Sequence, residues 1–254
     1  MLTIERCRCL LVAVCAVAFS VAVPGAAGAE RGEIFVLGTL YSRHNSVPAY
    51  DLDVLRRVVV AIDPDLAIVD CTPTEVRTRQ VHASKIEYPR VIFPLAAELG
   101  YGLHAAEPDE PLFTQIVVPL ADARQAFASA HADAAGALSA LDTATFAALR
   151  WYWRSPSEVH DPTTAAALHG HKALDTAFHG EVQSRADQQW HEHWVAQIAA
   201  AAAGQRGRRL LAVVGIDNRA GIDTALREDA RLRDFVVIDM PAWLREHGFG
   251  ASAR

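Results

Sequence analysis

Two stretches of this chain of 254 residues decide its fold: IFVLGTLYSRH at residues 34–44 and LLAVVGIDNRAG at residues 210–221. Each is a short apolar run, rich in Val, Ile and Leu, that ends at a glycine and then turns polar. This pattern is typical of a buried parallel strand. In an open α/β sheet, ligands bind just beyond the carboxyl ends of the strands. We therefore expect the functional site among the residues that follow the two runs, which are Tyr41, Arg43, His44, Asp217, Asn218 and Arg219.

Further apolar runs complete the expected sheet, and stretches with helical spacing connect them. The other strands are expected at Leu66–Cys71, Tyr101–Glu107 and Phe235–Met240. The helices beside them are expected at Tyr50–Ala61, with Ser46 as a cap, at Val91–Leu99 and at Gly221–Arg231. This alternation predicts parallel strands that are joined by right-handed crossovers.

A long segment without strand patterns, residues 108–204, separates the third strand from the fourth. Helices are expected there at Ala121–Ala137, Leu138–Trp153, Thr163–Phe178 and Val182–Ala203. The sequence thus predicts an α/β fold with a mainly parallel open sheet of about five strands. The all-helical insertion lies between strands three and four, and we expect it to cap the site at the strand ends.

Residues 1–29 have the pattern of a signal peptide. Arg6 and Arg8 precede a short apolar stretch, and Ala27-Gly28-Ala29 forms a small-residue cleavage signal. The apolar stretch is shorter than a membrane-spanning helix requires, although an uncleaved anchor is the alternative. We expect an exported protein, periplasmic or extracellular, whose mature chain 30–254 forms one α/β domain and meets a membrane only through such an anchor.

Charge and cysteine content restrict the partners. The net charge of −6 at pH 7 is mild, and no basic stripe is present, which argues against nucleic acid as a partner. Only Cys71 lies outside the expected signal segment, so the mature chain forms no internal disulfide.

The two glycine-ended stretches resemble motifs of the TraB/GumN/Tiki family, within the wider group of ChaN-like and erythromycin-esterase-like proteins. In that family the first strand ends in Gly-x-x-His, the second ends in a carboxylate, and a late strand ends in a second Gly-x-x-His. The corresponding segments are Val36–Tyr41, Ile68–Asp70 and Val213–Asn218, the last followed by Gly221. The resemblance covers most of residues 33–245 in layout and implies a hydrolase whose two histidines and carboxylate hold a metal.

This chain departs from the family motif at both histidines. The first family histidine falls on Tyr41 and the second on Asn218, while the carboxylate falls on Asp70. Phenol and amide groups are poor substitutes for imidazole as ligands of a borderline metal. The chain is therefore identified as a divergent member in which the metal chemistry of the family is in question.

Acidic residues at the strand ends offer two kinds of chemistry. Asp70, Glu75 and Glu107 lie at or just beyond the ends of strands two and three. Converging carboxylates bind hard divalent cations, with Asp70 and Glu107 as the candidate ligands, or serve as an acid/base pair. The alternative is that they cap the following helices. His44 is either an acid/base that swings in from its loop or a loop histidine without a catalytic role.

The histidines of the insertion do not have the spacing of a helical metal site. His169 and His171, like His191 and His193, are two residues apart, whereas two ligands on one helix face are three or four apart. We expect them to flank a packed apolar stripe.

Two functional hypotheses remain. The first is a divergent hydrolase of a peptide, ester or amide bond, with or without a divalent cation, in which His44, Asp70 and Glu107 are catalytic. The second is a non-catalytic relative that binds a small molecule or an exported protein in the same cleft. In both, the expected contacts to the bound molecule come from Gly38, Tyr41, Arg43, Glu75, Gly215, Asp217 and Asn218.

Overall fold

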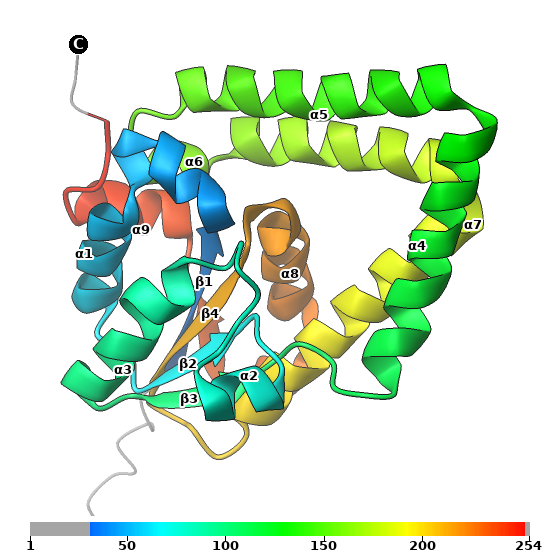
Figure 1. Cartoon of the computed structure of the whole chain (residues 1–254). Helices are drawn as coiled ribbons and strands as arrows, with labels where there is room; N and C mark the ends of the chain where they lie inside the picture. Colours follow the sequence, from blue (N-terminus) through cyan, green and yellow to red (C-terminus); the bar gives the residue numbers. More distant parts are fainter. Residues whose placement is uncertain (1–30, 252–254) are drawn as a thin grey trace, which may run out of the picture.

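The computed structural model describes residues 31–251, and the expected signal segment 1–29 lies outside that range. A five-stranded, all-parallel sheet forms its centre, with the strand order β3-β2-β4-β1-β5 (Figure 1). The strands are β1 (Gly32–Thr39), β2 (Leu66–Val69), β3 (Gly102–Ala105), β4 (Arg209–Gly215) and β5 (Phe235–Val237). The expected α/β fold with a parallel sheet is thereby confirmed.

The first and fourth strands are neighbours in this sheet. β1 and β4 pair in parallel from Glu33 opposite Arg209 to Thr39 opposite Gly215. β2 pairs with the other edge of β4. The polar residues that follow the two glycine-ended runs therefore come out at the same edge of the sheet.

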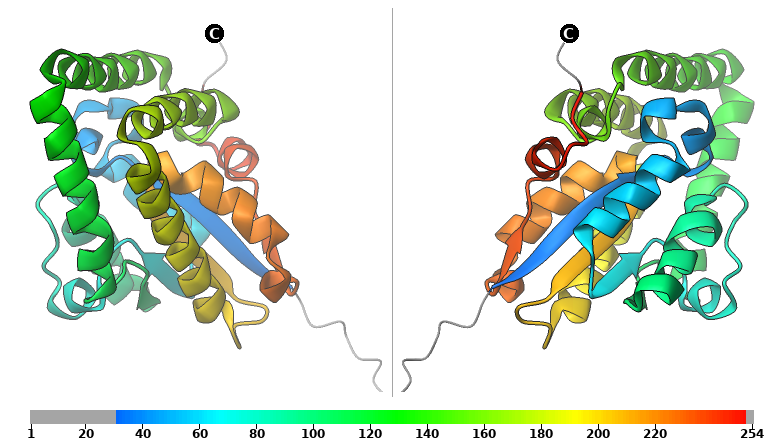
Figure 2. Two further views of the ribbon diagram at one scale, coloured as in Figure 1. Left: turned by 90° about the vertical axis from the view of Figure 1, so that its right-hand side faces the viewer. Right: turned by 90° about the vertical axis from the view of Figure 1, so that its left-hand side faces the viewer.

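Helices cover both faces of the sheet (Figure 2), because the inward residues of each strand alternate between the two faces. On β1, Phe35 and Leu37 face one core, together with α1 (Leu52–Ile62), α3 (Phe93–Leu99) and α9 (Met240–Glu246). Ile34 and Val36 face the other core, which contains residues of α8 (Ile216–Glu228) and of the C-terminal part of α7 (Pro162–Ala202).

The helix of the first crossover begins later than the sequence predicted. Residues 41–50 form two short 3₁₀ turns, η1 (Tyr41–Ser46) and η2 (Pro48–Tyr50), and α1 starts at Leu52. Asp51, not Ser46, caps α1, because its carboxylate accepts a hydrogen bond of 2.8 Å from the Val54 amide.

The second crossover contains α2 (Pro73–Thr78), a loop, a π-helical turn η3 (Tyr88–Ile92) and α3. Gly100, with φ at 79°, ends α3 in the left-handed conformation that glycine adopts without strain. The loop over residues 79–87 had no predicted structure, and it supplies two residues of the site described below.

The helical insertion is present, with other boundaries than the sequence predicted. Its helices are α4 (Leu112–Ala130), α5 (Ala132–Tyr152), the short α6 (Pro156–Val159) and α7. The two helices expected at its end are both present within α7, and the non-helical Gly180, with φ at 66° and ψ at −147°, separates them as the sequence predicted. α4, α5 and the first part of α7 project from the sheet as an arm (Figure 1).

α8 begins directly after β4, five residues earlier than predicted. Gly215 precedes its first turn, which holds Asp217 and Asn218. These two residues are thus part of a helix rather than of a loop. The last elements are the turn η4 (Ala230–Leu232), β5 and α9. None of the helices within residues 31–251 has the length and apolar character to span a membrane.

Candidate functional site

Tyr41 lies at the end of β1 in a strained conformation. Its φ is 52°, in the left-handed region that bulky residues rarely adopt. The conformation directs its phenol across Gly215, and a Cβ atom at Gly215 would overlap the Tyr41 hydroxyl. The hydroxyl donates a hydrogen bond of 2.5 Å to Oδ2 of Asp70. Burial and the neighbouring Asp70 carboxylate raise the pKa of Tyr41, so the phenol keeps its proton.

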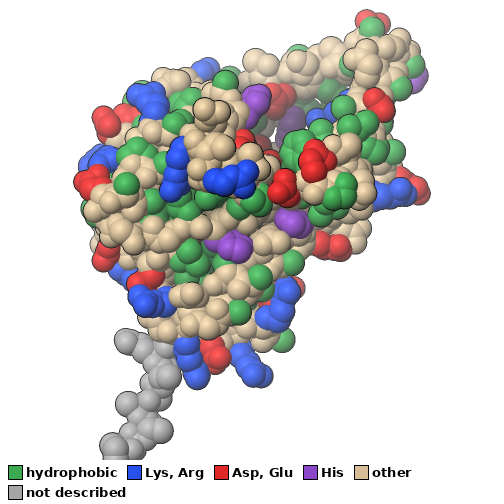
Figure 3. Space-filling view, turned by 60° about the horizontal axis from the view of Figure 1, so that its bottom comes forward, with side chains coloured by type: hydrophobic (Ala, Val, Ile, Leu, Met, Phe, Trp, Pro, Cys, Tyr) green, Lys and Arg blue, Asp and Glu red, His purple; other side chains and the backbone are tan. Residues whose placement is uncertain are grey.

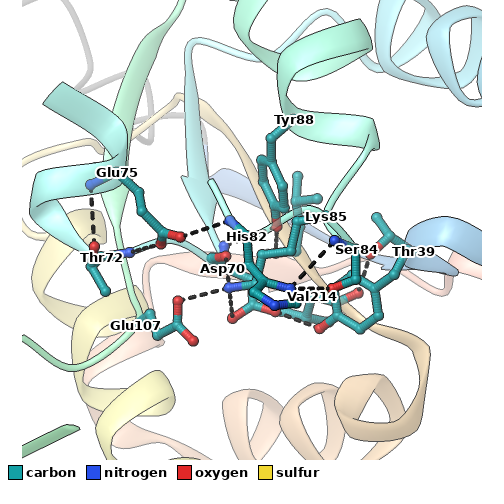
Figure 4. A network of polar contacts seen from close by, with 12 residues as sticks. Thr39, Asp70, Thr72, Glu75, His82, Ser84, Lys85, Tyr88, Glu107 and Val214 are labelled. Atoms are coloured by element: carbon teal, nitrogen blue, oxygen red, sulfur yellow. Dashed lines mark hydrogen bonds and ion pairs between the residues drawn. The ribbon is translucent and has the colours of Figure 1, made fainter. Parts of the chain in front are cut away.

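Asp70 and Glu107 converge as the sequence predicted, but they converge on a lysine. The ammonium Nζ of Lys85 lies 2.7 Å from Oε2 of Glu107, 2.7 Å from the Asp70 carbonyl and 3.8 Å from Oδ1 of Asp70 (Figure 4). The three side chains are only 12%, 8% and 11% exposed for Lys85, Asp70 and Glu107. Burial lowers the pKa of Lys85, but the two carboxylates raise it by more than burial lowers it. The amine therefore stays protonated at neutral pH.

The two carboxyls bonded to Lys85 are not equivalent. Burial and repulsion from Asp70 raise the pKa of Glu107 to about 7, although Lys85 opposes this shift. The side chain of Asp70 accepts one hydrogen bond from Tyr41, while its backbone amide donates to the Tyr88 hydroxyl at 3.0 Å.

The loop that carries Lys85 is held by Glu75. The Glu75 carboxylate accepts hydrogen bonds from the amides of Thr72, at 2.8 Å, and His82, at 3.2 Å. With the Thr72 hydroxyl it forms a capping box at the start of α2. Glu75 therefore caps α2 and anchors the Lys85 loop (Figure 4). Helix capping was the alternative that the sequence left open, and this placement does not support the expected contact of Glu75 with a bound molecule.

Glu87 is a third carboxyl of the cluster, which the sequence interpretation missed. It is fully buried, and within the described residues neither of its carboxyl oxygens has a hydrogen-bond partner. The Thr39 hydroxyl lies near enough to lower the pKa of Glu87, yet it donates to the Val214 carbonyl at 3.3 Å. Burial raises the pKa of Glu87 to about 7. The residue directly precedes the π-helical turn η3, a type of turn that is frequent at functional sites.

His44 does not join this cluster. It is buried, its Nε2 accepts a hydrogen bond of 3.0 Å from the Leu40 amide, and its Nδ1 lies 2.6 Å from the Tyr50 carbonyl. Burial lowers its pKa to about 4, which leaves the ring neutral at pH 7. Both ring nitrogens serve the backbone, so this placement does not support the expected acid/base role.

His160 of the insertion is bound in the same way. Its Nε2 accepts a hydrogen bond of 2.9 Å from the Gly38 amide, and its Nδ1 lies 2.7 Å from the Pro156 carbonyl. The Gly38 carbonyl in turn accepts from the Tyr50 hydroxyl at 2.9 Å. A Cβ atom at Gly38 would overlap the Ile216 side chain and crowd that of Arg219, and Arg219 is buried. The missing side chains of the two motif glycines, Gly38 and Gly215, thus leave room for neighbouring side chains of the protein. Neither glycine faces an open space for a bound molecule.

A cavity of about 510 Å³ lies between the arm and the first turn of α8. In Figure 3 it appears as a hollow with acidic and histidine side chains at its edges. Apolar parts of its wall come from Phe127, Leu138 and Leu168. Asp217 and Asn218 reach it from the end of β4, and an adjoining hollow of about 460 Å³ shares these two residues.

Most charges in the cavity wall are paired with each other. Arg124 contacts Asp175 at 2.7 Å, and Lys172 contacts Asp187 at 3.4 Å. Lys172 also donates to Oδ1 of Asn218 at 3.3 Å. Asp142 lies 3.5 Å from Nε2 of His171 and 3.8 Å from Arg43.

Of the residues expected to contact a bound molecule, Asp217 lines this cavity and Arg43 does not. Arg43 lies outside its wall, with its guanidinium 3.7 Å above the ring of Phe146. Asp217 is exposed to the cavity and forms no hydrogen bond or ion pair with the other described residues. Crowding by protein atoms raises the pKa of Asp217, while Arg43, His171 and Lys172 oppose this shift.

The residues at the strand ends do not fit the metal that the family resemblance implies. The phenol of Tyr41 is bonded to Asp70, the amide oxygen of Asn218 is bonded to Lys172, and the Lys85 ammonium lies between Asp70 and Glu107. Within residues 31–251, no three His, Cys, Asp or Glu side chains are arranged to hold a metal ion. A divalent cation at Asp70 would be repelled by the ammonium.

Local sequence patterns did not indicate Lys85 and Glu87, because both lie in a loop between two short helices. The one available signal was the alternation of Lys85 and Glu87 with apolar residues in SKIEYP, residues 84–89.

Comparison of the chain with protein-family models, with curated proteins and with solved structures gives no match.

Proposed function

We propose that this chain is a divergent TraB/Tiki-like protein that binds a small organic ligand in the cavity between the helical arm and α8. The observation that carries the proposal is the place of this cavity. It borders on Asp217 and Asn218, directly beyond the carboxyl end of β4, where parallel α/β sheets bind their ligands. Its volume of about 510 Å³ falls within the range of small-molecule sites.

The lining indicates the chemistry of the ligand. Phe127, Leu138 and Leu168 offer apolar surface. Among the lining residues, four aspartates face one arginine and one lysine, so negative charge is in excess. Asp217 is the aspartate without a described ion-pair partner. A ligand with an apolar body and a cationic group satisfies both features.

Calorimetric titration with arylalkylamines, and with carboxylates of the same carbon skeletons, tests the proposal. We expect the amines to bind and the carboxylates to bind more weakly. The variant Ser139→Trp places an indole in the cavity wall and should abolish binding. Its matched control is Ala140→Trp, at an exposed neighbouring position that does not line the cavity.

Asp217→Asn provides the electrostatic test. Loss of the unpaired charge should weaken amine binding by about tenfold and leave carboxylate binding unchanged or stronger. Binding of the amines that is equal in the wild type and in Ser139→Trp would overturn the proposed site, as would the absence of binding by every member of the panel.

A second candidate, metal-independent hydrolysis, is favoured by the cluster at the strand ends. Glu107 has a pKa near 7 and lies next to Lys85, and Tyr41 is strained. Perturbed acids and strained residues gather at catalytic sites. Glu107 would act as the general base on water, and the Tyr41 hydroxyl would donate to the developing oxyanion after releasing its hydrogen bond to Asp70.

Chromogenic esters and amides test this candidate directly. We expect Glu107→Gln to remove any hydrolysis, with the rate of the wild type rising as pH passes through about 7. Glu110→Gln, on an exposed residue in the next loop, is the matched control. A rate that Glu107→Gln leaves unchanged would exclude Glu107 as the base.

The proposal includes export of the chain. The residues that support it are the charged start and the small-residue signal Ala27-Gly28-Ala29. Mass spectrometry of the protein recovered from cells should give an N-terminus at Glu30, and the full-length mass in the cytoplasmic fraction would contradict export.

A further inference from the structure

The carboxylates at the strand ends surround one position, and the Lys85 ammonium occupies it. Nζ lies 2.7 Å from Oε2 of Glu107 and 2.7 Å from the carbonyl of Asp70, with Oδ1 of Asp70 at 3.8 Å (Figure 4). Carboxylate and carbonyl oxygens are the ligands of hard cations such as Mg²⁺, Mn²⁺ and Ca²⁺. The protein thus directs the oxygens of a cation site toward a cation from its own chain.

This arrangement differs from a surface ion pair. The side chains of Lys85, Asp70 and Glu107 are at most 12% exposed, so their charges have little water to stabilise them. Buried charges persist only when they are paired and hydrogen-bonded. Without the ammonium, Asp70 and Glu107 would be two buried carboxyls with no positive partner among the described contacts.

The cluster also holds more acid than the lysine neutralises. Asp70 and Glu107 are two carboxyls beside the single ammonium of Lys85, and the charge of Glu87 acts on the cluster without a described contact to the lysine. Glu87 is fully buried, and both of its oxygens are unpartnered within residues 31–251. A second positive charge at the same position would therefore be electrostatically favourable, provided that the ammonium were removed.

We propose that Lys85 is the resident cation of this site, that it takes the place a divalent ion would occupy between Asp70 and Glu107, and that its removal creates a divalent-cation site. The chain would then have exchanged an external metal for an internal ammonium. The structure supports this exchange through the 2.7 Å contacts of Nζ and through the loop that Glu75 holds in place.

The experiment compares Mn²⁺ binding by the wild-type chain and by Lys85→Ala at pH 7.5. We expect the variant to bind a single Mn²⁺ ion per chain in equilibrium dialysis and the wild type to bind none. In the variant, Mn²⁺ at a hundredfold excess over its dissociation constant should raise the melting temperature by about 5 to 10 °C. The wild type should show no such rise.

Two further variants establish where the ion is bound. Lys85→Ala combined with Glu107→Gln should lose the Mn²⁺ ion, because it lacks a ligand. Lys85→Ala combined with Glu98→Gln is the matched control, since Glu98 lies on the surface and pairs with Arg56, and it should keep the ion.

Lys85→Ala removes a buried positive charge, and it will unfold if the carboxylates repel strongly enough. In that case Mn²⁺ should restore its far-ultraviolet circular dichroism, and a chelator should abolish the restored signal. Three results would overturn the proposal: Mn²⁺ binding by the wild type as tight as by the variant, no binding and no restored folding in the variant, or an unchanged ion in the variant without Glu107.

Discussion

Tyr41 bonds to Asp70 across a strand that lies between them. The two residues follow β1 and β2, which are not neighbours in the sheet, because β4 separates them. The 2.5 Å hydrogen bond passes over Gly215, at the end of β4, which has no Cβ to block it. Gly215, the glycine of the second motif, thus leaves room for the side chain of Tyr41, which follows the glycine of the first motif.

A methyl group at Gly215 should disrupt this contact. We expect Gly215→Ala to lower the free energy of unfolding by about 1–3 kcal/mol, because the new Cβ overlaps the Tyr41 ring and hydroxyl. Urea denaturation measures the change. Gly221→Ala is the control. Its Cβ would meet only the His191 ring, with Cε1 at 3.4 Å and Nδ1 at 3.7 Å, and because it lies inside α8 the substitution should be neutral or stabilising. Equal effects of the two substitutions would contradict the proposed overlap.

The hydrogen bond itself is tested by Tyr41→Phe. Its acceptor is a buried carboxylate, so its loss should cost about 1.5–3 kcal/mol of unfolding free energy. Tyr101→Phe is the matched comparison, because the Tyr101 hydroxyl donates to the neutral carbonyl of Ile92 at 2.8 Å. It should cost only about 0.5–1.5 kcal/mol. The reverse order of the two costs would contradict the greater strength expected of the Tyr41–Asp70 hydrogen bond.

Glu87 should make the stability of the protein fall as the pH rises. Its pKa in the folded protein, about 7, is above the ordinary value of 4.5. Its contribution is therefore fully present below pH 4.5 and is lost as the pH rises through 7. A shift of this size corresponds to about 3 kcal/mol.

Glu87→Gln tests this dependence, because the amide has a similar shape and does not ionise. The unfolding free energy of the variant, relative to the wild type, should increase by up to about 3 kcal/mol between pH 4.5 and pH 8. Urea denaturation at a series of pH values measures the difference. A difference that does not change with pH would mean that Glu87 ionises in the fold without cost.

His44 and His160 should act in the opposite direction on the acidic side. Burial lowers their pKa values to about 4 and about 3, below the ordinary 6.5. Their contribution to stability is present above pH 6.5 and is lost as the pH falls through these lower values. The Cε1–H resonances of both rings should not titrate between pH 5 and pH 8. In the chain unfolded by urea, both resonances should titrate near 6.5. Titration near 6.5 in the folded protein would contradict the hydrogen bonds of both rings to the backbone.

Much of the fold followed from local patterns. The apolar runs of β1 and β4 are too short and too continuous for surface helices, and their terminal glycines mark where the strands end. Parallel pairing followed from the helices between the strands. The boundaries were less predictable, since α8 begins at Ile216 and not at the expected Gly221, whereas the break at Gly180 lies where its glycine predicted it.

The candidate site was predictable only in part. Asp70 and Glu107 converge as expected, because each follows a strand of the same parallel sheet. His44 was placed in the site by its proximity in sequence to Tyr41. The 3₁₀ turn of residues 41–46 instead turns its ring toward the backbone of Leu40 and Tyr50.

The sequence by itself determined the parallel sheet and the edge at which its polar residues gather, because strand and helix periodicity is encoded locally. Only the tertiary structure decided what these residues contact. Lys85 and Glu87 come from a segment whose alternation with apolar residues is too short to predict an element, and it is folding that brings the Lys85 ammonium against Asp70 and Glu107. That contact depends on charges which are far apart along the chain and which become neighbours only when the strand ends are assembled.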